Sequence, residues 1–471
     1  MGMVSLPMAN LLLRTTHCRK RPGRNTEEKS TAESMELALV GDRLDSRREY
    51  MHQTRWSRFW LPTKHLRDED IGPPPDGGVT AWTQSALAHL IMLNTWGIIN
   101  SFGIFQSYYT DSLNRSPSDI AWIGSLQIFF LLLLSASSGR AFDSGAFRPV
   151  AMTGALVHGL GILLASAATR YWEVLITQGF LVGVGNGLLF CPTVSLVSTY
   201  FTTKKSLAIG ISAAGSATGG IVFSMTVRDL LPRIGFPSTM RVLACISLLN
   251  SALALVLLRP RIPPRPSGSY FEHTAFQEQL YVSYCLGMCL ICWGLYFVFY
   301  YIGAFTRDVV GLTYTESLNH VLLINAVGYV GRVLPAYLAD QYFGPLNMLI
   351  PCAMVSGIVA FCWPAVHSGQ ESLAFAMIYG LFASGAQSLY LVTLASLAQD
   401  VHQAGTRMGM CFTINSLFAL TGPPIAGALI QASGRGYLDA QMWGGSAIMA
   451  GTLILLAGRL RATGRRLRVR V

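Results

Sequence analysis

Residues 319–339, NHVLLINAVGYVGRVLPAYLA, form an apolar run that contains one permanently charged side chain, Arg332. About 20 apolar residues in a helix cross the hydrocarbon core of a bilayer, which is about 30 Å thick. A charge in that core costs at least about 2.5 kcal/mol unless it faces a water-filled cavity or a partner. The run therefore predicts a membrane-spanning helix whose arginine either lines an anion pathway or binds loop charges and backbone carbonyls as a structural element.

The rest of the chain repeats this pattern. It has 471 residues, of which 51% are hydrophobic and only 13% are charged, whereas soluble domains carry about 25% charged residues. Backbone groups in lipid must be hydrogen-bonded internally, and the runs do not alternate as barrel strands do, so we expect helices. Twelve spans are predicted from Val79 onward: 79–105, 119–138, 149–168, 172–194, 206–227, 239–258, 279–305, 318–339, 346–366, 371–398, 408–431 and 441–459.

The net charge of +11 does not indicate a nucleic-acid-binding protein, because lysine and arginine concentrate in the N-terminal tail, in some loops and at 459–470. Cytosolic loops of membrane proteins carry an excess of these residues. If both termini are cytosolic, the cytosolic loops and C-terminal tail together carry more lysine and arginine than the outside loops. Asn114, in the sequon at 114–116, then lies in the first outside loop as a candidate glycosylation site. We expect a multi-pass protein of the plasma membrane.

Composition also divides the chain. Residues 1–75 are polar and charged without sustained periodicity, so we expect a disordered cytosolic tail. The segment 259–277 begins with RPRIPPRP and is expected to be an extended cytosolic linker. It separates one six-helix bundle at 76–258 from a second at 278–460, and a basic cytosolic tail occupies 461–471.

The two halves resemble each other at an offset of about 200 residues. The sequence GRAFD at 139–143 follows the second span, and AYLAD at 336–340 follows the eighth. GVGNG at 183–187 has a counterpart in GLFASG at 380–385. Two similar six-helix halves are typical of transporters that rock around a substrate site near the midplane.

Longer motifs point to a family. DGGVTAW at 76–82, NSFGIFQSYY at 100–109, the region from Tyr200 to Gly220 and the eighth span around Arg332 resemble monocarboxylate-porter-like members of the major facilitator superfamily, especially fungal ones. The resemblance covers about residues 73–460. It implies an all-α membrane protein with twelve transmembrane helices in two pseudo-symmetric six-helix bundles, the major facilitator fold.

Two positions depart from that family. Its proton-coupled members have a lysine in the first span, where this chain has Asn100, and an aspartate four residues before the arginine of the eighth span, where it has Gly328. We find no Asp or Glu near the middle of any span. A coupled proton would therefore be carried by a histidine such as His158, by a span-end carboxylate such as Glu278, or by the substrate.

Polar side chains within the spans are the candidate substrate-binding groups. Arg332 would attract the negative or carbonyl end of a substrate, and amides and tyrosines would orient the remainder. Each amide could instead bond another helix, and the tyrosines could pack as a helix face. The candidates are Arg332, Asn100, Asn325, Asn415, Gln387, Tyr296 and Tyr300.

A second group resembles the cytosolic gating motif of the superfamily. An aspartate there can accept hydrogen bonds from a helix N-terminus or pair with an arginine, and so hold one state closed. The alternative is an ordinary solvated turn. The candidates are Gly139, Arg140, Asp143 and Arg148, with Asp340 in the second copy.

The expected function is transport of a small organic anion or polar metabolite by alternating access, and protons are a further candidate partner. The alternative is export of a secondary metabolite; a non-transporting membrane sensor would need a long structured extension. No phosphate-binding loop of the form GxxxxGK[ST] occurs, and no span contains His, Asp or Glu at acid–base or metal-ligand spacing. We therefore expect no enzyme activity, cofactor or metal.

Overall fold

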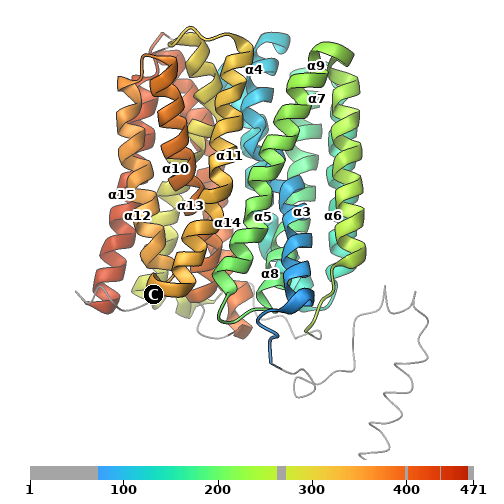
Figure 1. Cartoon of the computed structure of the whole chain (residues 1–471), viewed down its shortest axis with the longest axis vertical. Coiled ribbons are helices and arrows are strands. Elements are labelled where there is room, and N and C mark those ends of the chain that lie inside the picture. The colour runs from blue at the N-terminus through green and yellow to red at the C-terminus, as the bar shows by residue number, and fades with distance from the viewer. Residues whose placement is uncertain (1–72, 263–271, 398–400, 435, 465–471) are drawn as a thin grey trace, which may run out of the picture. The chain divides into compact units, whose positions relative to one another are not determined.

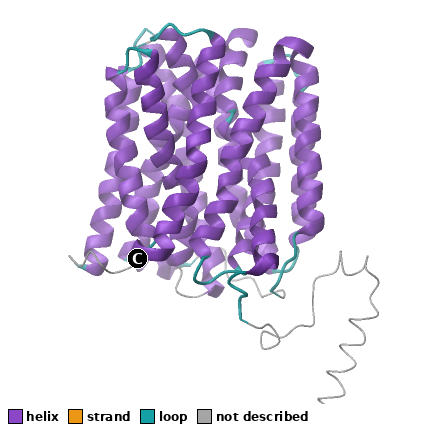
Figure 2. Ribbon diagram, viewed as in Figure 1, coloured by secondary structure: helices purple, strands orange, loops and turns teal. Residues whose placement is uncertain are grey.

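Long helices build the whole of the described structure (Figure 2). This computed structural model describes residues 73–262, 272–397, 401–434 and 436–464, without the side chains of 401–405, and these residues contain no strand. The predicted N-terminal tail as far as residue 72, residues 263–271 of the predicted linker and 465–471 of the predicted C-terminal tail lie outside the described residues.

The first six spans, which we call the N-half, run from α3 to α9 (Figure 1). Ser101 separates the first two helices with a φ of −86° and a ψ of −2°. The elements are α3 (Gly78–Asn100), α4 (Phe102–Leu113), α5 (Pro117–Asp143), α6 (Phe147–Ala165), α7 (Tyr171–Val174), the π-helix η2 (Leu175–Leu181), α8 (Val182–Ser198) and α9 (Lys205–Leu257).

The last six spans, the C-half, run from α10 to α15 and lie to the left of the N-half in Figure 1. A short 3₁₀ helix, η3 (His273–Gln277), precedes them. The elements are α10 (Gln279–Asp308), α11 (Tyr314–Leu338), the π-helix η4 (Ala339–Phe343), α12 (Pro345–Cys362), the 3₁₀ helix η5 (Trp363–Ala365), α13 (Gly369–Leu397), α14 (Val401–Ala432) and α15 (Leu438–Thr463).

Within the described residues, eleven helices are long and apolar enough to cross a membrane, and α9 accounts for two of the twelve predicted spans. It has 53 residues, and at about 1.5 Å per residue it would be far longer than a bilayer is thick. Gly235 turns the chain back with a φ of 76°, a conformation that glycine adopts readily. The predicted loop between the two spans is therefore mostly helical.

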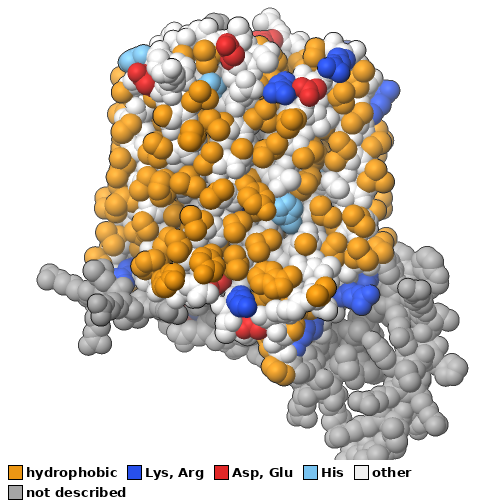
Figure 3. Space-filling view, viewed as in Figure 1, with side chains coloured by type: hydrophobic (Ala, Val, Ile, Leu, Met, Phe, Trp, Pro, Cys, Tyr) orange, Lys and Arg blue, Asp and Glu red, His pale blue; other side chains and the backbone are white. Residues whose placement is uncertain are grey.

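Charged and apolar side chains lie at different levels along the helix axes. In Figure 3, hydrophobic side chains cover the middle of the visible face, and charged side chains gather near its two ends. We call the end where α3 begins, beside Asp76, the Asp76 end, and the opposite end, where α4 ends, the Asn114 end. This distribution is that of a multi-pass membrane protein, because charges are costly in hydrocarbon.

Glycines bring helices of the N-half into close contact. A Cβ atom added at Gly219 of α9 would collide with the carbonyl oxygen of Leu93 and lie 2.7 Å from the Cα atom of Gly97 in α3. Similarly, Gly183 of α8 leaves only 3.0 Å between an added Cβ and the Cα atom of Gln127 in α5. Small residues at these positions therefore let the fifth span pack closely on the first and the fourth span on the second.

We expect Gly219→Ala to lower the thermal unfolding temperature of the purified protein. Alanine favours a helix over glycine by about 1 kcal/mol. The collision with Leu93 should nevertheless outweigh that gain, because overpacking costs about 1–3 kcal/mol.

Gly303→Ala in α10 is the matched control, since its added Cβ would lie 3.6 Å from the nearest atom, in Val321. This variant should unfold at the same or a higher temperature than the wild type. Equal stability of the two variants would contradict the close-packing argument.

Candidate functional site

A small cavity lies between the two halves. Its volume is about 30 Å³, close to the space that one water molecule occupies in the liquid. We call it the central pocket. Residues of α3, α9, α10, α11 and α13 line it: Met92, Trp96, Ala213, Ser216, Tyr296, Arg332, Gln387, Ser388, Tyr390 and Leu391.

Arg332 is the charged residue of the central pocket, and only 1% of it is exposed. Its guanidinium donates hydrogen bonds to the carbonyl oxygen of Gly328 at 3.0 Å and to the side-chain oxygen of Gln387 at 2.6 Å. No carboxylate among the described residues forms an ion pair with it. Two neutral acceptors thus hold a buried cation whose charge is not neutralised locally.

Three of the predicted binding residues meet at this pocket, namely Arg332, Gln387 and Tyr296. Two more lie directly behind its wall. Asn415 donates to the Tyr390 hydroxyl at 2.9 Å, and Asn100 donates to the Ser216 carbonyl at 3.4 Å. Both amides therefore position pocket residues rather than line the pocket.

The other two predicted binding residues do not line the central pocket. Asn325 donates to the Val321 carbonyl of its own helix at 2.9 Å and packs against Gly220 of α9. Tyr300 packs against Phe102, with 5.0 Å between the ring centroids. Both belong to contacts between the halves outside the pocket.

Trp96 is the main pocket residue that the sequence analysis missed. Its ring is stacked on that of Tyr296, with centroids 6.1 Å apart and an interplanar angle of 16°. The repeat offset of about 200 residues was the available signal, because position 96 plus 200 is position 296. Met92, Ser216, Ser388 and Tyr390 were also missed, since such residues are common throughout helix interfaces.

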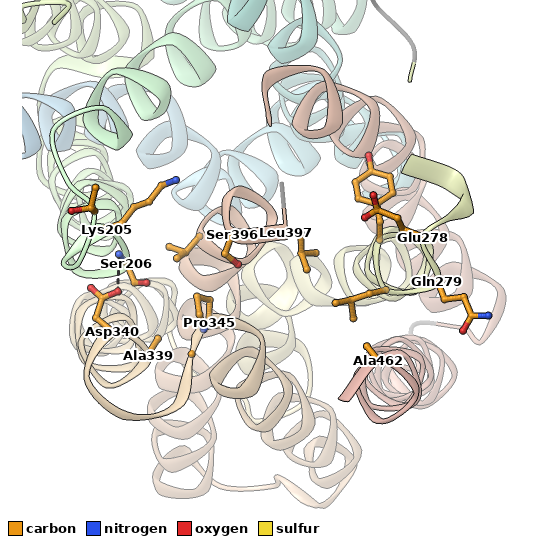
Figure 4. Close-up of a pocket in the computed structure, with 15 residues that line it drawn as sticks. Lys205, Ser206, Glu278, Gln279, Ala339, Asp340, Pro345, Ser396, Leu397 and Ala462 are labelled. Atoms are coloured by element: carbon orange, nitrogen blue, oxygen red, sulfur yellow. Dashed lines mark hydrogen bonds between the residues drawn. The ribbon is translucent and has the colours of Figure 1, made fainter. Parts of the chain in front are cut away.

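A larger cleft opens at the Asp76 end. Its volume is about 750 Å³, and residues of both halves line it, among them Lys205 and Ser206 of α9 and Glu278 of the C-half (Figure 4). We call it the end cleft. Asp340 accepts hydrogen bonds from the backbone N–H groups of Ser206 at 3.1 Å and Leu207 at 2.7 Å. A C-half carboxylate thus binds the N-terminus of an N-half helix, where the helix dipole favours negative charge.

The first copy of the predicted gating motif lies at the C-terminus of α5, also at the Asp76 end. Gly139 allows close packing, because its added Cβ would lie 2.9 Å from the Cys191 sulfur. Arg140 and Asp143 occupy the last turn of α5. Arg148 donates to the carbonyl oxygens of Leu255 at 3.3 Å and Leu258 at 3.4 Å, which stabilises the C-terminus of α9.

The remaining candidates lie elsewhere. Asn114 is exposed at the end of α4, in a left-handed conformation with a φ of 49°. His158 lies within 2.7 Å of the side-chain oxygen of Asn186, and Glu278 binds Arg407. In the described part of the chain, no three His, Cys, Asp or Glu side chains are placed to hold a metal ion.

Asp76 stabilises the loop that leads into α9. Its carboxylate accepts hydrogen bonds from the backbone N–H groups of Thr202 at 2.9 Å and Thr203 at 3.0 Å, and from the Thr203 hydroxyl. Burial acts to raise the pKa of Asp76, but these hydrogen bonds, with that from Lys204, outweigh it and hold the pKa well below its usual range. The stabilisation is therefore present above the unfolded-state pKa of about 3.9 and is lost as the pH falls toward the folded-state pKa.

We expect Asp76→Asn to unfold at a lower temperature than the wild type, with a difference that stays constant between about pH 5 and 8 and shrinks below about pH 4. Thermal unfolding of the detergent-purified proteins across pH measures this difference. Asp229→Asn, which changes an exposed carboxylate paired with Arg228, is the control and should have little effect. A difference that varies between pH 5 and 8 would contradict the assignment.

Comparison with known proteins supports the same architecture. The family model of the Major Facilitator Superfamily matches residues 86–406. An MFS-type transporter of Gibberella zeae is 42% identical over 393 residues, covering 83% of this chain and 89% of the relative. MFS-type transporter dbaD of Emericella nidulans is 32% identical over 386 residues (81% and 85%), and the aspyridones efflux protein apdF of that organism is 31% identical over 391 residues (82% and 79%).

These matches confirm the predicted fold and the prediction that the chain is a transporter and not an enzyme. They also agree with a multi-pass membrane protein that carries a small molecule. The matched region contains α5 to α13 and every residue that lines the central pocket. The chain therefore belongs to the Major Facilitator Superfamily.

Proposed function

We propose that this transporter exports a small organic anion, or a polar metabolite with a strongly polarised carbonyl group, by alternating access. The central pocket is the binding site, and Arg332 with Gln387 is the recognition pair. The observation that carries this proposal is the buried Arg332 guanidinium, which lies between the halves and has only neutral acceptors within hydrogen-bonding distance.

Electrostatics supports an anionic or carbonyl cargo. An unneutralised cation in a low-dielectric site attracts a negative group more strongly than it would in water. Gln387 can rotate away from Arg332 or stay beside it, and its amide nitrogen has no partner among the described residues. That nitrogen can donate to the same cargo oxygen atoms, so the pair offers donors from two helices.

The proposed alternation uses contacts at both ends. At the Asn114 end, the halves meet through a hydrogen bond of 2.9 Å from the Ser118 hydroxyl to the Pro424 carbonyl. At the Asp76 end, the contact of Asp340 with α9 lies beside the end cleft. Breaking one set while the other forms would expose the central pocket to each side in turn. We place both termini in the cytosol and the protein in the plasma membrane, since the basic loops then lie inside.

Export is proposed because one relative is named as an efflux protein. The chain also lacks the coupling pair of the monocarboxylate porters that it resembles. Gly328 replaces the family's aspartate, and an added Cβ there would lie 2.8 Å from a guanidinium nitrogen of Arg332. The guanidinium and the Ser384 side chain thus occupy the space of an acidic side chain, and a coupled proton would have to be carried elsewhere or on the cargo.

Arg332→Gln should reduce transport of an anionic cargo about 10- to 100-fold, because a hydrogen bond to a charged group contributes about 1.5–3 kcal/mol. A panel of labelled organic acids, followed in cells as uptake and efflux with surface expression checked, measures the effect. Arg233→Gln, which alters an exposed arginine of α9 near the Asn114 end, is the matched control and should transport normally. Equal transport by Arg332→Gln would reject the anion site and favour a neutral cargo.

Asp340→Ala should favour the state that is open at the Asp76 end, because it removes two charge-assisted hydrogen bonds between the halves. The readout is alkylation of Ser396→Cys in the end cleft, in a background without the exposed Cys245 and Cys362. We expect labelling about tenfold faster.

Glu371→Ala is the matched control for the gate. Glu371 accepts hydrogen bonds from the N–H groups of His367 at 2.8 Å and Ser368 at 3.1 Å, all within the C-half and at the Asn114 end. Its removal should leave the labelling rate unchanged. Equal labelling rates in Asp340→Ala and wild type would show that Asp340 is an ordinary helix cap.

A further inference from the structure

An aromatic stack closes the central pocket across the boundary between the halves. Trp96 belongs to α3 of the N-half and Tyr296 to α10 of the C-half. Their rings are nearly parallel, at 16°, with centroids 6.1 Å apart, and both residues line the pocket beside Arg332. Tyr296 is 4% exposed, so the stack shields its ring from solvent in this state.

Further aromatic rings support the stack from behind. The rings of Phe190 and Trp96 form a T-shaped pair with a centroid distance of 5.6 Å, and Phe190 contacts Phe412 at 5.9 Å. Phe412 in turn contacts Tyr390, whose hydroxyl is held by Asn415. A series of aromatic rings therefore extends from Trp96 to Tyr390, which lines the pocket together with the Arg332–Gln387 pair.

Separating the halves must separate these two rings, because each ring belongs to a different half. The separated faces lose their mutual contact. A flat conjugated ring inserted between them would restore stacking on both faces, whereas a puckered saturated ring would not. Ring faces pack at about 3.5–4.0 Å, so an inserted ring requires the two side chains to stand about 7–8 Å apart. The 6.1 Å stack must therefore widen, which couples cargo binding to movement of the halves.

We propose that the cargo is a planar, conjugated acid or enol whose ring inserts between Trp96 and Tyr296 while its charged or carbonyl oxygen atoms bind Arg332 and Gln387. This inference rests on the proposed function and specifies its substrate class. Trp96 and Tyr296 are the specificity-determining residues, and Arg332 supplies affinity that does not depend on ring planarity.

The test compares two acids of equal charge and similar size, 2-naphthoate and its fully saturated decahydro analogue. Binding to the purified full chain in lipid nanodiscs is measured by isothermal titration. The wild type should bind the aromatic acid at least about tenfold more tightly, because stacking on two faces is lost for the saturated ring. Trp96→Leu should abolish that preference and keep residual binding of both acids, and Trp96→Phe should restore part of it.

Trp172→Leu is the matched control, since this tryptophan is 54% exposed and lies outside the pocket, so the preference should persist. Arg332→Gln should weaken the binding of both acids by a similar factor. Suppose the wild type binds the two acids equally and Arg332→Gln weakens the binding of both. That result would overturn the aromatic inference and leave the anion site intact. Failure of both acids to bind the wild type would overturn both proposals.

Discussion

The rest of the site depends on how the buried guanidinium of Arg332 is accommodated. Its donors are bonded to a backbone carbonyl of α11 and to an amide of α13. Because both acceptors are neutral, the helices satisfy the hydrogen bonds without cancelling the charge. A carboxylate partner would have made Arg332 a structural ion pair. Neutral acceptors instead leave a positive potential in the pocket between the two halves.

Glycine contacts determine where this charge lies. Gly219 of α9 brings α3 close, and Gly210 of the same helix lies against Ala336 and the backbone of Arg332 in α11. One arm of α9 thus contacts its own half on one side and the arginine-bearing helix on the other. The N-terminus of that arm is held by Asp76 from the N-half and Asp340 from the C-half. A single helix therefore connects the packing, the site and the proposed gate.

Much of the site could be predicted because charged and amide groups stand out in apolar spans. Arg332 and Gln387 were singled out for that reason, and they form a direct hydrogen bond. Asn325 stood out equally, yet it bonds its own helix, since composition does not say which face a side chain occupies. Trp96 did not stand out because large aromatic residues are common in membrane helices, and its role depends on a partner 200 positions away.

The sequence by itself determined the number of spans, their approximate limits and the helical class, because a bilayer requires long apolar segments with internally satisfied backbones. It also implied two similar halves through the repeated motifs. Only the tertiary structure decided which polar groups meet, that the chain turns back at the non-helical residue Gly235 between two helical arms, and that Trp96 stacks on Tyr296. The physical reason is that such contacts depend on helix rotation and close packing between distant segments, which hydropathy does not encode.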